Sequence, residues 1–331
     1  MKPKIAFIGT GGTLSSLGAH SLDFVDYSLS GKRLNADEIV ANVPELQLYA
    51  DIVPVSFRGL ASFDIAWPEW CELVGLCETL VEEHADLSGI VIGHGTSTME
   101  ETAYVLNLTL TIDVPVVLVG AQRPFDSLSS DGPINLVNAV RVALCAEARN
   151  MGVLVVLNDA IHAAREVTKG STLRLHAFQS PDSGPLGCVD GDRVSFYRRP
   201  LRRHYPRTEF DMAASDSMPR VDIVYAYPGS DGTAIQAFLQ AGAKGIVSAG
   251  FAPGHPGSLE DRILQEASDA GVIVVQASRA QEGRVPEGRR LLEGKALSAD
   301  NLNPEKARLL LALALSQGYD AQEIRRIFAT Y

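Results

Sequence analysis

Short apolar stretches alternate with amphipathic helical patterns along this chain, and that alternation constrains its fold more than any other sequence feature. Strands alternating with helices are typical of mostly parallel sheets covered by helices on both faces. We therefore predict an α/β fold with a doubly wound sheet in the first half of the chain. The expected strands there are 5–9, 52–55, 89–93, 115–120 and 153–157, and the expected helices are 68–84 and 131–151.

Two domains are expected, because 331 residues exceed what one hydrophobic core usually serves. From Tyr197 the sequence becomes basic and then polar without periodicity, which is typical of a linker. We predict a larger N-terminal α/β domain over 1–200, a linker over 201–220 and a smaller C-terminal α/β domain over 221–331. In the smaller domain the expected strands are 221–225, 245–249 and 272–276, and the expected helices are 233–241, 258–270 and 303–316.

Charge and hydropathy exclude several classes of partner. The net charge of −11 argues against a nucleic-acid or anionic-membrane surface. No apolar run approaches the ~20 residues of a membrane span, and the first strand is too short for a signal-peptide core. We therefore expect a cytoplasmic protein that binds a small molecule. The cysteines lack CxxC pairing and are expected to be buried free thiols: Cys71, Cys77, Cys145 and Cys188.

Several familiar catalytic motifs are missing from the sequence. Leu14 stands where the third glycine of a dinucleotide fingerprint belongs, and no phosphate loop is present. There is no G-x-S-x-G elbow and no HExxH, and the seven histidines are scattered. We therefore expect neither a metal nor another cofactor.

Hydroxyl side chains gather where two of the expected strands end. Thr10 and Thr13 follow the first strand in "IGTGGTLSS", and Thr96, Ser97 and Thr98 follow the third in "GHGTSTMEETAYVL". The carboxyl ends of strands are where α/β proteins place their chemistry. For the second group, helix capping is the alternative role, whereas backbone amides at the same place would suit an oxyanion or a carboxylate.

Seven blocks, in order over nearly the whole chain, resemble the bacterial-type L-asparaginase and glutaminase family. They are "TGGTL", "GHGTSTMEETA", "GAQRPFDSLSSDGPINLVNAV", "NDAIHAAREVTKGST", "FQSPDSGPLG", "VDIVYAYPG" and "NLNPEKARLLL". The resemblance implies a catalytic N-terminal domain that cleaves a carboxamide through a threonine acyl-enzyme, without a cofactor. It also implies a homo-oligomer, a dimer or a tetramer, whose active sites are shared between subunits.

Four positions match the reactive residues of this family. Thr13 matches the nucleophile, and Tyr27 matches a tyrosine on a mobile loop beside it, with Phe24 as a weaker match. An unassisted hydroxyl is a poor nucleophile, so it needs a base of this kind. Thr96 matches the second threonine of the site, and Lys169 matches the catalytic lysine. An ordinary surface loop is the alternative for the segment that carries the tyrosine.

Three positions that bind the α-amino-acid end of the substrate in this family differ here. Ser97 stands in place of an aspartate, Phe63 follows Ser62 where the family has serine and glutamine, and Pro253 replaces an asparagine from the neighbouring subunit. An ammonium buried without an anion is unfavourable by several kcal/mol. We therefore predict an amide substrate that lacks a free α-ammonium. A carboxylate from elsewhere that occupies the space vacated by this aspartate, beside Lys169, would contradict the prediction.

The glutamate that completes the first triad of the family has two candidates, Glu282 and Glu287, and we favour Glu287 as a site residue. Two alternatives to the altered substrate stay open. One is a true L-asparaginase or glutaminase that releases ammonia. The other is a ligand-binding homologue without catalysis, because a fold does not fix a function.

Overall fold

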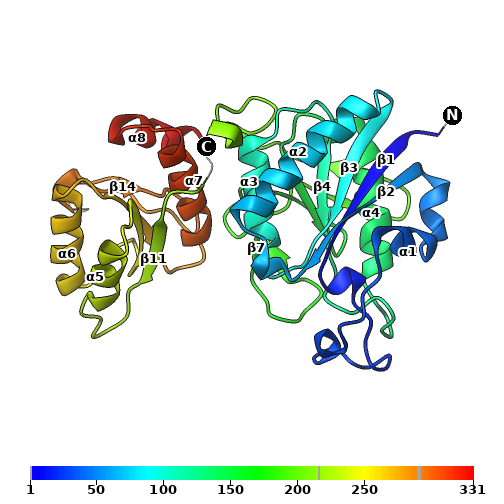
Figure 1. Cartoon of the computed structure of the whole chain (residues 1–331), viewed down its shortest axis with the longest axis horizontal. Helices are drawn as coiled ribbons and strands as arrows, with labels where there is room; N and C mark the ends of the chain where they lie inside the picture. The colour runs from blue at the N-terminus through cyan, green and yellow to red at the C-terminus, as the bar shows by residue number, and fades with distance from the viewer. Residues whose placement is uncertain (1, 215–216, 289–291) are drawn as a thin grey trace. The chain divides into compact units, whose positions relative to one another are not determined.

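The computed structural model describes residues 2–214, 217–288 and 292–331, and the chain divides into two compact units (Figure 1). The units are Met1–Thr208 and Glu209–Tyr331, so their boundary falls within the segment for which a linker is expected. Each unit has its own sheet and its own hydrophobic core. Every helix in the described part of the chain is too short or too polar to cross a membrane.

The main sheet of the first unit has the strand order β10-β9-β6-β5-β4-β3-β1-β2 among the described residues. Strands β1 to β5 run parallel, whereas β6, β9 and β10 add an antiparallel edge. A separate ribbon pairs β7 with β8. The bounds are β1 (Lys4–Gly11), β2 (Asp51–Leu60), β3 (Leu87–Gly93), β4 (Val116–Val119), β5 (Leu154–Leu157), β6 (Ala160–Ala163), β7 (Thr168–Lys169), β8 (Phe178–Gln179), β9 (Gly187–Val189) and β10 (Val194–Phe196).

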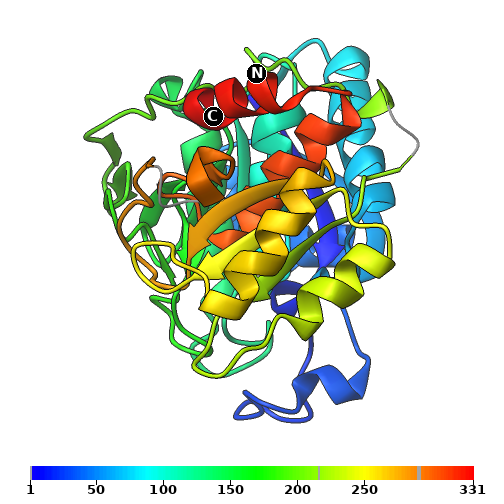
Figure 2. The ribbon, with the colours of Figure 1, turned by 90° about the vertical axis from the view of Figure 1, so that its left-hand side faces the viewer.

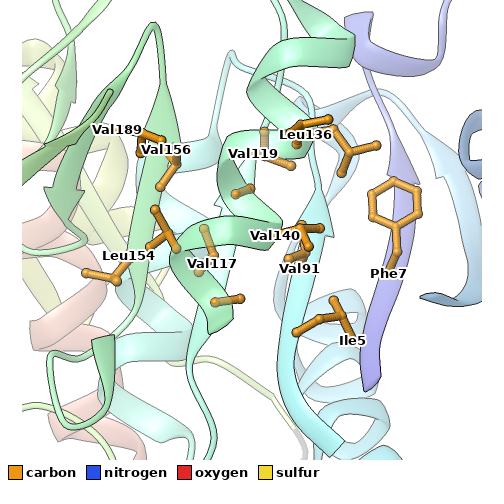
Figure 3. Close-up of a cluster of buried hydrophobic side chains, with 14 of the residues drawn as sticks. Ile5, Phe7, Val91, Val117, Val119, Leu136, Val140, Leu154, Val156 and Val189 are labelled. Carbon is orange, nitrogen blue, oxygen red and sulfur yellow. The ribbon is translucent and has the colours of Figure 1, made fainter. Parts of the chain in front are cut away.

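Helices cover both faces of this sheet, because its central strands are apolar on both sides (Figure 1). The helices α1 (Ala36–Ala41) and α4 (Gly132–Leu144) pack on one face, and α2 (Trp67–Glu83) and α3 (Met99–Thr109) pack on the other. Figure 3 shows the core under α4, where Phe7, Val91 and Val119 of the strands lie near Leu136 and Val140 of the helix.

The second unit is a smaller parallel sheet in the order β11-β12-β13-β14 (Figure 2). Helices α5 and α6 form a core with one face of the sheet, and α7 packs on the other. The predicted α/β fold, with a mostly parallel first domain and a smaller second one, is confirmed. The bounds are β11 (Val221–Tyr225), α5 (Thr233–Gln240), β12 (Gly245–Gly250), α6 (Ser258–Asp269), β13 (Ile273–Ser278), β14 (Leu297–Ser298), α7 (Pro304–Ser316) and α8 (Ala321–Thr330).

Some local expectations are wrong. The helix expected over 131–151 ends at Leu144, because Cys145 is extended and the left-handed Asn150 and Gly152 turn the chain into β5. β2 runs on to Leu60, beyond the apolar residues that predicted it, because strand pairing with β1 continues there. All four cysteines are free, but only Cys77 is fully buried, since the others lie at partly exposed positions.

Gln276 on β13 is a polar side chain inside the second core. It is fully buried, and neither its amide nitrogen nor its amide oxygen has a hydrogen-bond partner among the described residues. A buried amide of this kind destabilises a fold by about 1–3 kcal/mol. We expect Gln276→Met, which is similar in length, to raise the free energy of unfolding by about 1 kcal/mol in a denaturant titration. A decrease would mean that the amide is satisfied in solution.

Candidate active site

The site is built where the strands β1, β2 and β3 end at the same edge of the sheet. Gly9 of β1 pairs with Gly93 of β3, and Gly11 of β1 pairs with Leu60 of β2. From β1 the chain continues to β2 on one side, and from β3 it continues to β4 on the other side. The ends of β1 and β3 are therefore a topological switch point of the sheet. The loops that follow these three strands therefore meet.

Two glycines allow these loops to touch. Gly12 has a left-handed φ of +79°, and a Cβ placed on it would lie 2.3 Å from Cα of Gly95. A Cβ on Gly95 would lie 2.8 Å from Cβ of Ser62. Backbones approach this closely only where side chains are missing. The contact sets the positions of Thr13 and Thr96, each of which follows one of the two glycines directly.

Thr13 begins the short 3₁₀ turn Thr13–Ser15 and is buried. Its Oγ1 lies 2.8 Å from the phenolic oxygen of Tyr27, and either hydroxyl can donate in this pair. Thr10, three residues earlier, instead donates its hydroxyl to the carbonyl of Gly93 at 2.9 Å. The two threonines of the first loop are therefore different: one ties the loop to β3, and the other presents its hydroxyl to a tyrosine.

Tyr27 lies in the segment between β1 and α1, at the start of the 3₁₀ turn Tyr27–Ser30. The segment is closed at its base by a bridge between Ser16 and Arg33. The ring of Phe24, the weaker match for the tyrosine, lies under the guanidinium of Arg123 at 5.5 Å. Tyr27 is thus the aromatic residue that the structure brings to Thr13.

A second hydrogen-bonded pair, between a threonine hydroxyl and a lysine ammonium, joins the loop before α3 to the ribbon β7–β8. Lys169 of β7 donates from Nζ to Oγ1 of Thr96 at 2.7 Å. Burial lowers the pKa of the Lys169 ammonium, and the negative charge of Glu100 acts in the opposite direction. Thr96 and Lys169, which are 73 residues apart in sequence, are therefore direct partners.

Glu100, in the first turn of α3, is a site residue that the sequence did not identify. Its Oε1 accepts hydrogen bonds from the backbone N–H of Lys169 at 2.9 Å and from the hydroxyl of Thr168 at 3.1 Å. In the sequence it is only an acidic residue suited to a helix start, because its partner is 69 residues away. A carboxylate therefore does lie at the backbone of Lys169, and it comes from the first turn of α3 and not from position 97.

The residues expected to bind the α-amino-acid end of the substrate differ in their exposure to solvent. Ser62 is buried, and its carbonyl accepts a hydrogen bond from the Thr98 hydroxyl at 2.6 Å. Phe63 and Ser97 are both exposed, and the Phe63 side chain reaches 70% exposure. The loop contacts described above place Ser62 next to Gly95, one residue before Thr96.

Glu282, Glu287 and Pro253 belong to the second unit. Both glutamates are exposed on the segment that follows β13, and Pro253 lies in the turn that follows β12. The choice of Glu287 over Glu282 stays a prediction.

His94 lies in the loop that follows β3, two residues before Thr96. It is fully buried, its Nδ1 is 2.8 Å from the carbonyl oxygen of Gly95, and burial lowers its pKa to about 4. The imidazole is therefore neutral near pH 7. Because a carbonyl oxygen can only accept, Nδ1 carries the proton and donates it to Gly95, which holds the loop.

In the described ranges, no group of three or more His, Cys, Asp or Glu residues could hold a metal ion.

Family models and relatives match nearly the whole chain. Residues 4–202 match the family "Asparaginase, N-terminal", and residues 220–328 match the "Glutaminase/Asparaginase C-terminal domain". The chain is 38% identical to a glutaminase-asparaginase of Acinetobacter glutaminasificans over 100% of both chains. It is 37% identical to the "Probable L-asparaginase periplasmic" of Haemophilus influenzae, covering 99% of this chain and 93% of that protein. The crystal structure of the "Probable Cytoplasmic L-asparaginase" of Campylobacter jejuni superposes with a TM-score of 0.94 at 39% identity over 100% of both chains.

Proposed function

The chain belongs to the asparaginase and glutaminase family of amide hydrolases, and we propose that it cleaves the side-chain amide of L-asparagine or L-glutamine through an acyl-enzyme on Thr13. The names of its relatives support this choice of substrate. The observation that carries the proposal is that each of two buried threonine hydroxyls is hydrogen-bonded to a side chain that can relay a proton.

In the first step, Oγ1 of Thr13 attacks the carbon of the substrate amide. The proton of Thr13 passes by way of Tyr27 to the leaving nitrogen, the C–N bond breaks, and ammonia departs from a threonine ester. The distance of 2.8 Å between the two hydroxyl oxygens supports this transfer. A neutral phenol must hand on its own proton to accept another, and we propose that Glu287, or else Glu282, of a neighbouring subunit holds this proton until the leaving nitrogen takes it.

In the second step, a water molecule attacks the ester and restores Thr13. The pair Thr96 and Lys169 takes one proton from the water as its oxygen bonds to the ester carbon. The C–O bond to Thr13 then breaks, and the pair returns this proton to Oγ1 of Thr13. The acid product gives its remaining proton to solvent and leaves as a carboxylate. A lysine with a lowered pKa is more often neutral near pH 7 than a solvated one, which supports a role for Lys169 in this relay.

Ammonia release tests the proposed substrate directly. Wild-type protein would be assayed with L-asparagine, L-glutamine, succinamic acid and an N-acylated asparagine. We expect kcat/KM to be highest for one of the two free amino acids. Preference for succinamic acid or for the N-acylated substrate would instead support an amide without a free α-ammonium.

That second candidate rests on Ser97, an exposed neutral residue where the resemblance places an aspartate. If the pocket lacks an anion for the α-ammonium, Ser97→Asp should raise kcat/KM for asparagine about tenfold, because a hydrogen bond to a charged group contributes about 1.5–3 kcal/mol. Succinamic acid has no ammonium, so its kcat/KM should stay constant or fall. Ser97→Asn is the matched neutral control. If Ser97→Asp does not favour asparagine, this candidate is contradicted.

Two further properties are proposed from the sequence and its family resemblance. We propose a homo-oligomer, a dimer or a tetramer, in which Glu287 and Pro253 complete a neighbouring site. A cytoplasmic location is proposed from the sequence, although the names of the relatives include both a cytoplasmic and a periplasmic protein.

A further inference from the structure

Lys169 sits on a very small piece of secondary structure. β7 is two residues long and pairs only with β8 among the described residues, as Thr168 opposite Gln179 and Lys169 opposite Phe178. An isolated two-stranded ribbon is marginally stable by itself. A lysine that must hold its Nζ 2.7 Å from a hydroxyl therefore needs a firmer attachment than its own strand provides.

Glu100 provides that attachment from α3, a helix of 11 residues. Its Oε1 accepts the backbone N–H of Lys169 and the hydroxyl of Thr168, while Thr96, just before the same helix, accepts the ammonium of Lys169. The lysine is thus fastened to one helix start at two points, at its backbone and at the end of its side chain.

We propose that Glu100 is a positioning residue of the active site, whose carboxylate holds the backbone of Lys169 so that its ammonium meets Thr96. This inference rests on the function proposed above, because it assigns Glu100 a part in the relay of the second step. Glu100 does not itself touch the atoms that react; it acts through Lys169.

The charge of Glu100 gives the proposal a second consequence. Burial has the larger effect on the Lys169 ammonium and lowers its pKa. The negative charge of Glu100 has the smaller effect and raises the pKa. Phe178 lies opposite Lys169 in the ribbon, and the hydroxyl of Thr96 accepts a hydrogen bond from the ammonium; neither side chain is charged. Removing the carboxylate charge should therefore lower the pKa of Lys169 further.

Two substitutions distinguish the effect of the Glu100 hydrogen bonds from the effect of its negative charge. Glu100→Ala removes both hydrogen bonds, and we expect kcat to fall about 10- to 100-fold at every pH while KM changes little, because catalytic groups tolerate little misplacement. Glu100→Gln keeps an acceptor oxygen, so kcat should stay within a few-fold of wild type, while the limb of the pH profile that depends on Lys169 moves to lower pH. Glu82→Gln, an exposed glutamate of α2, is the control with the same loss of charge.

A measurement without substrate keeps this inference separate from the proposed function. Competitive acetylation of amines, followed by mass spectrometry, reports the pKa of Lys169 directly. We expect a lower value in Glu100→Gln and the wild-type value in Glu82→Gln. Thermal unfolding checks that each variant is folded, and Glu100→Gln carries the test if Glu100→Ala does not fold.

The possible outcomes separate the two ideas. If wild-type protein does not hydrolyse asparagine or glutamine but Glu100→Gln shifts the labelling of Lys169, the proposed function fails and the contact stands. If wild-type protein is active but Glu100→Ala keeps full kcat, or Glu100→Gln leaves the labelling unchanged, the positioning role is overturned.

Discussion

Replacement of Thr13 by alanine is expected to lower the rate of amide hydrolysis at least about 10³-fold, because no other hydroxyl can form the acyl-enzyme in its place. The side chain is 9% exposed, and its hydroxyl is bonded to Tyr27. Alanine fits the same space, so the fold should be retained. Ammonia release would measure the loss of rate, and mass spectrometry after incubation with a reactive amide or ester would look for an adduct on residue 13.

Thr10 supplies the matched control for this experiment. It is the same residue type in the same loop, but its hydroxyl is committed to the carbonyl of Gly93. We expect Thr10→Ala to lower the free energy of unfolding by about 1 kcal/mol, while the acyl adduct still forms on Thr13. Full turnover by Thr13→Ala would exclude a threonine acyl-enzyme at this position. An adduct on another residue would move the nucleophile elsewhere.

Gly12→Ala should disable the site without removing a single reactive group. The new Cβ would lie 2.3 Å from Cα of Gly95, and alanine would also be held at a left-handed φ of +79°. Overpacking against backbone together with this strain should lower the free energy of unfolding by about 3 kcal/mol or more. Because the contact sets the spacing of Thr13 and Thr96, we also expect at least about a 100-fold loss in kcat. Denaturant titration and ammonia release would measure the two effects.

Gly184 shows what a positive φ costs where an added Cβ causes no clash. It has a similar φ of +70° in the same unit, but a Cβ there would meet nothing within 4 Å. Gly184→Ala should therefore lower the free energy of unfolding by only about 1 kcal/mol and leave activity unchanged. If Gly12→Ala were no worse than Gly184→Ala, the two loops would not be in close contact in solution.

Local patterns were sufficient to predict the α/β fold, whereas the candidate reactive residues came from the resemblance to a family. Buried parallel strands appear in a sequence as short apolar runs, so β1, β3, β4 and β5 could be placed within a few residues. Helix ends and the edge of the sheet were harder to place. The antiparallel strands β6, β9 and β10 are only three or four residues long, which is too short for an apolar pattern to stand out.

By itself, the sequence determined the layered architecture and the family, and through the family resemblance it proposed Thr13, Tyr27, Thr96 and Lys169 as the reactive residues. Only the tertiary structure decided which threonine of the first loop meets the tyrosine, that Glu100 holds the lysine, and that two glycines bring the loops into contact. The physical reason is that periodicity reports burial within one segment. Contacts between residues 69 or 73 positions apart arise instead from strand register and helix packing, which no local pattern encodes.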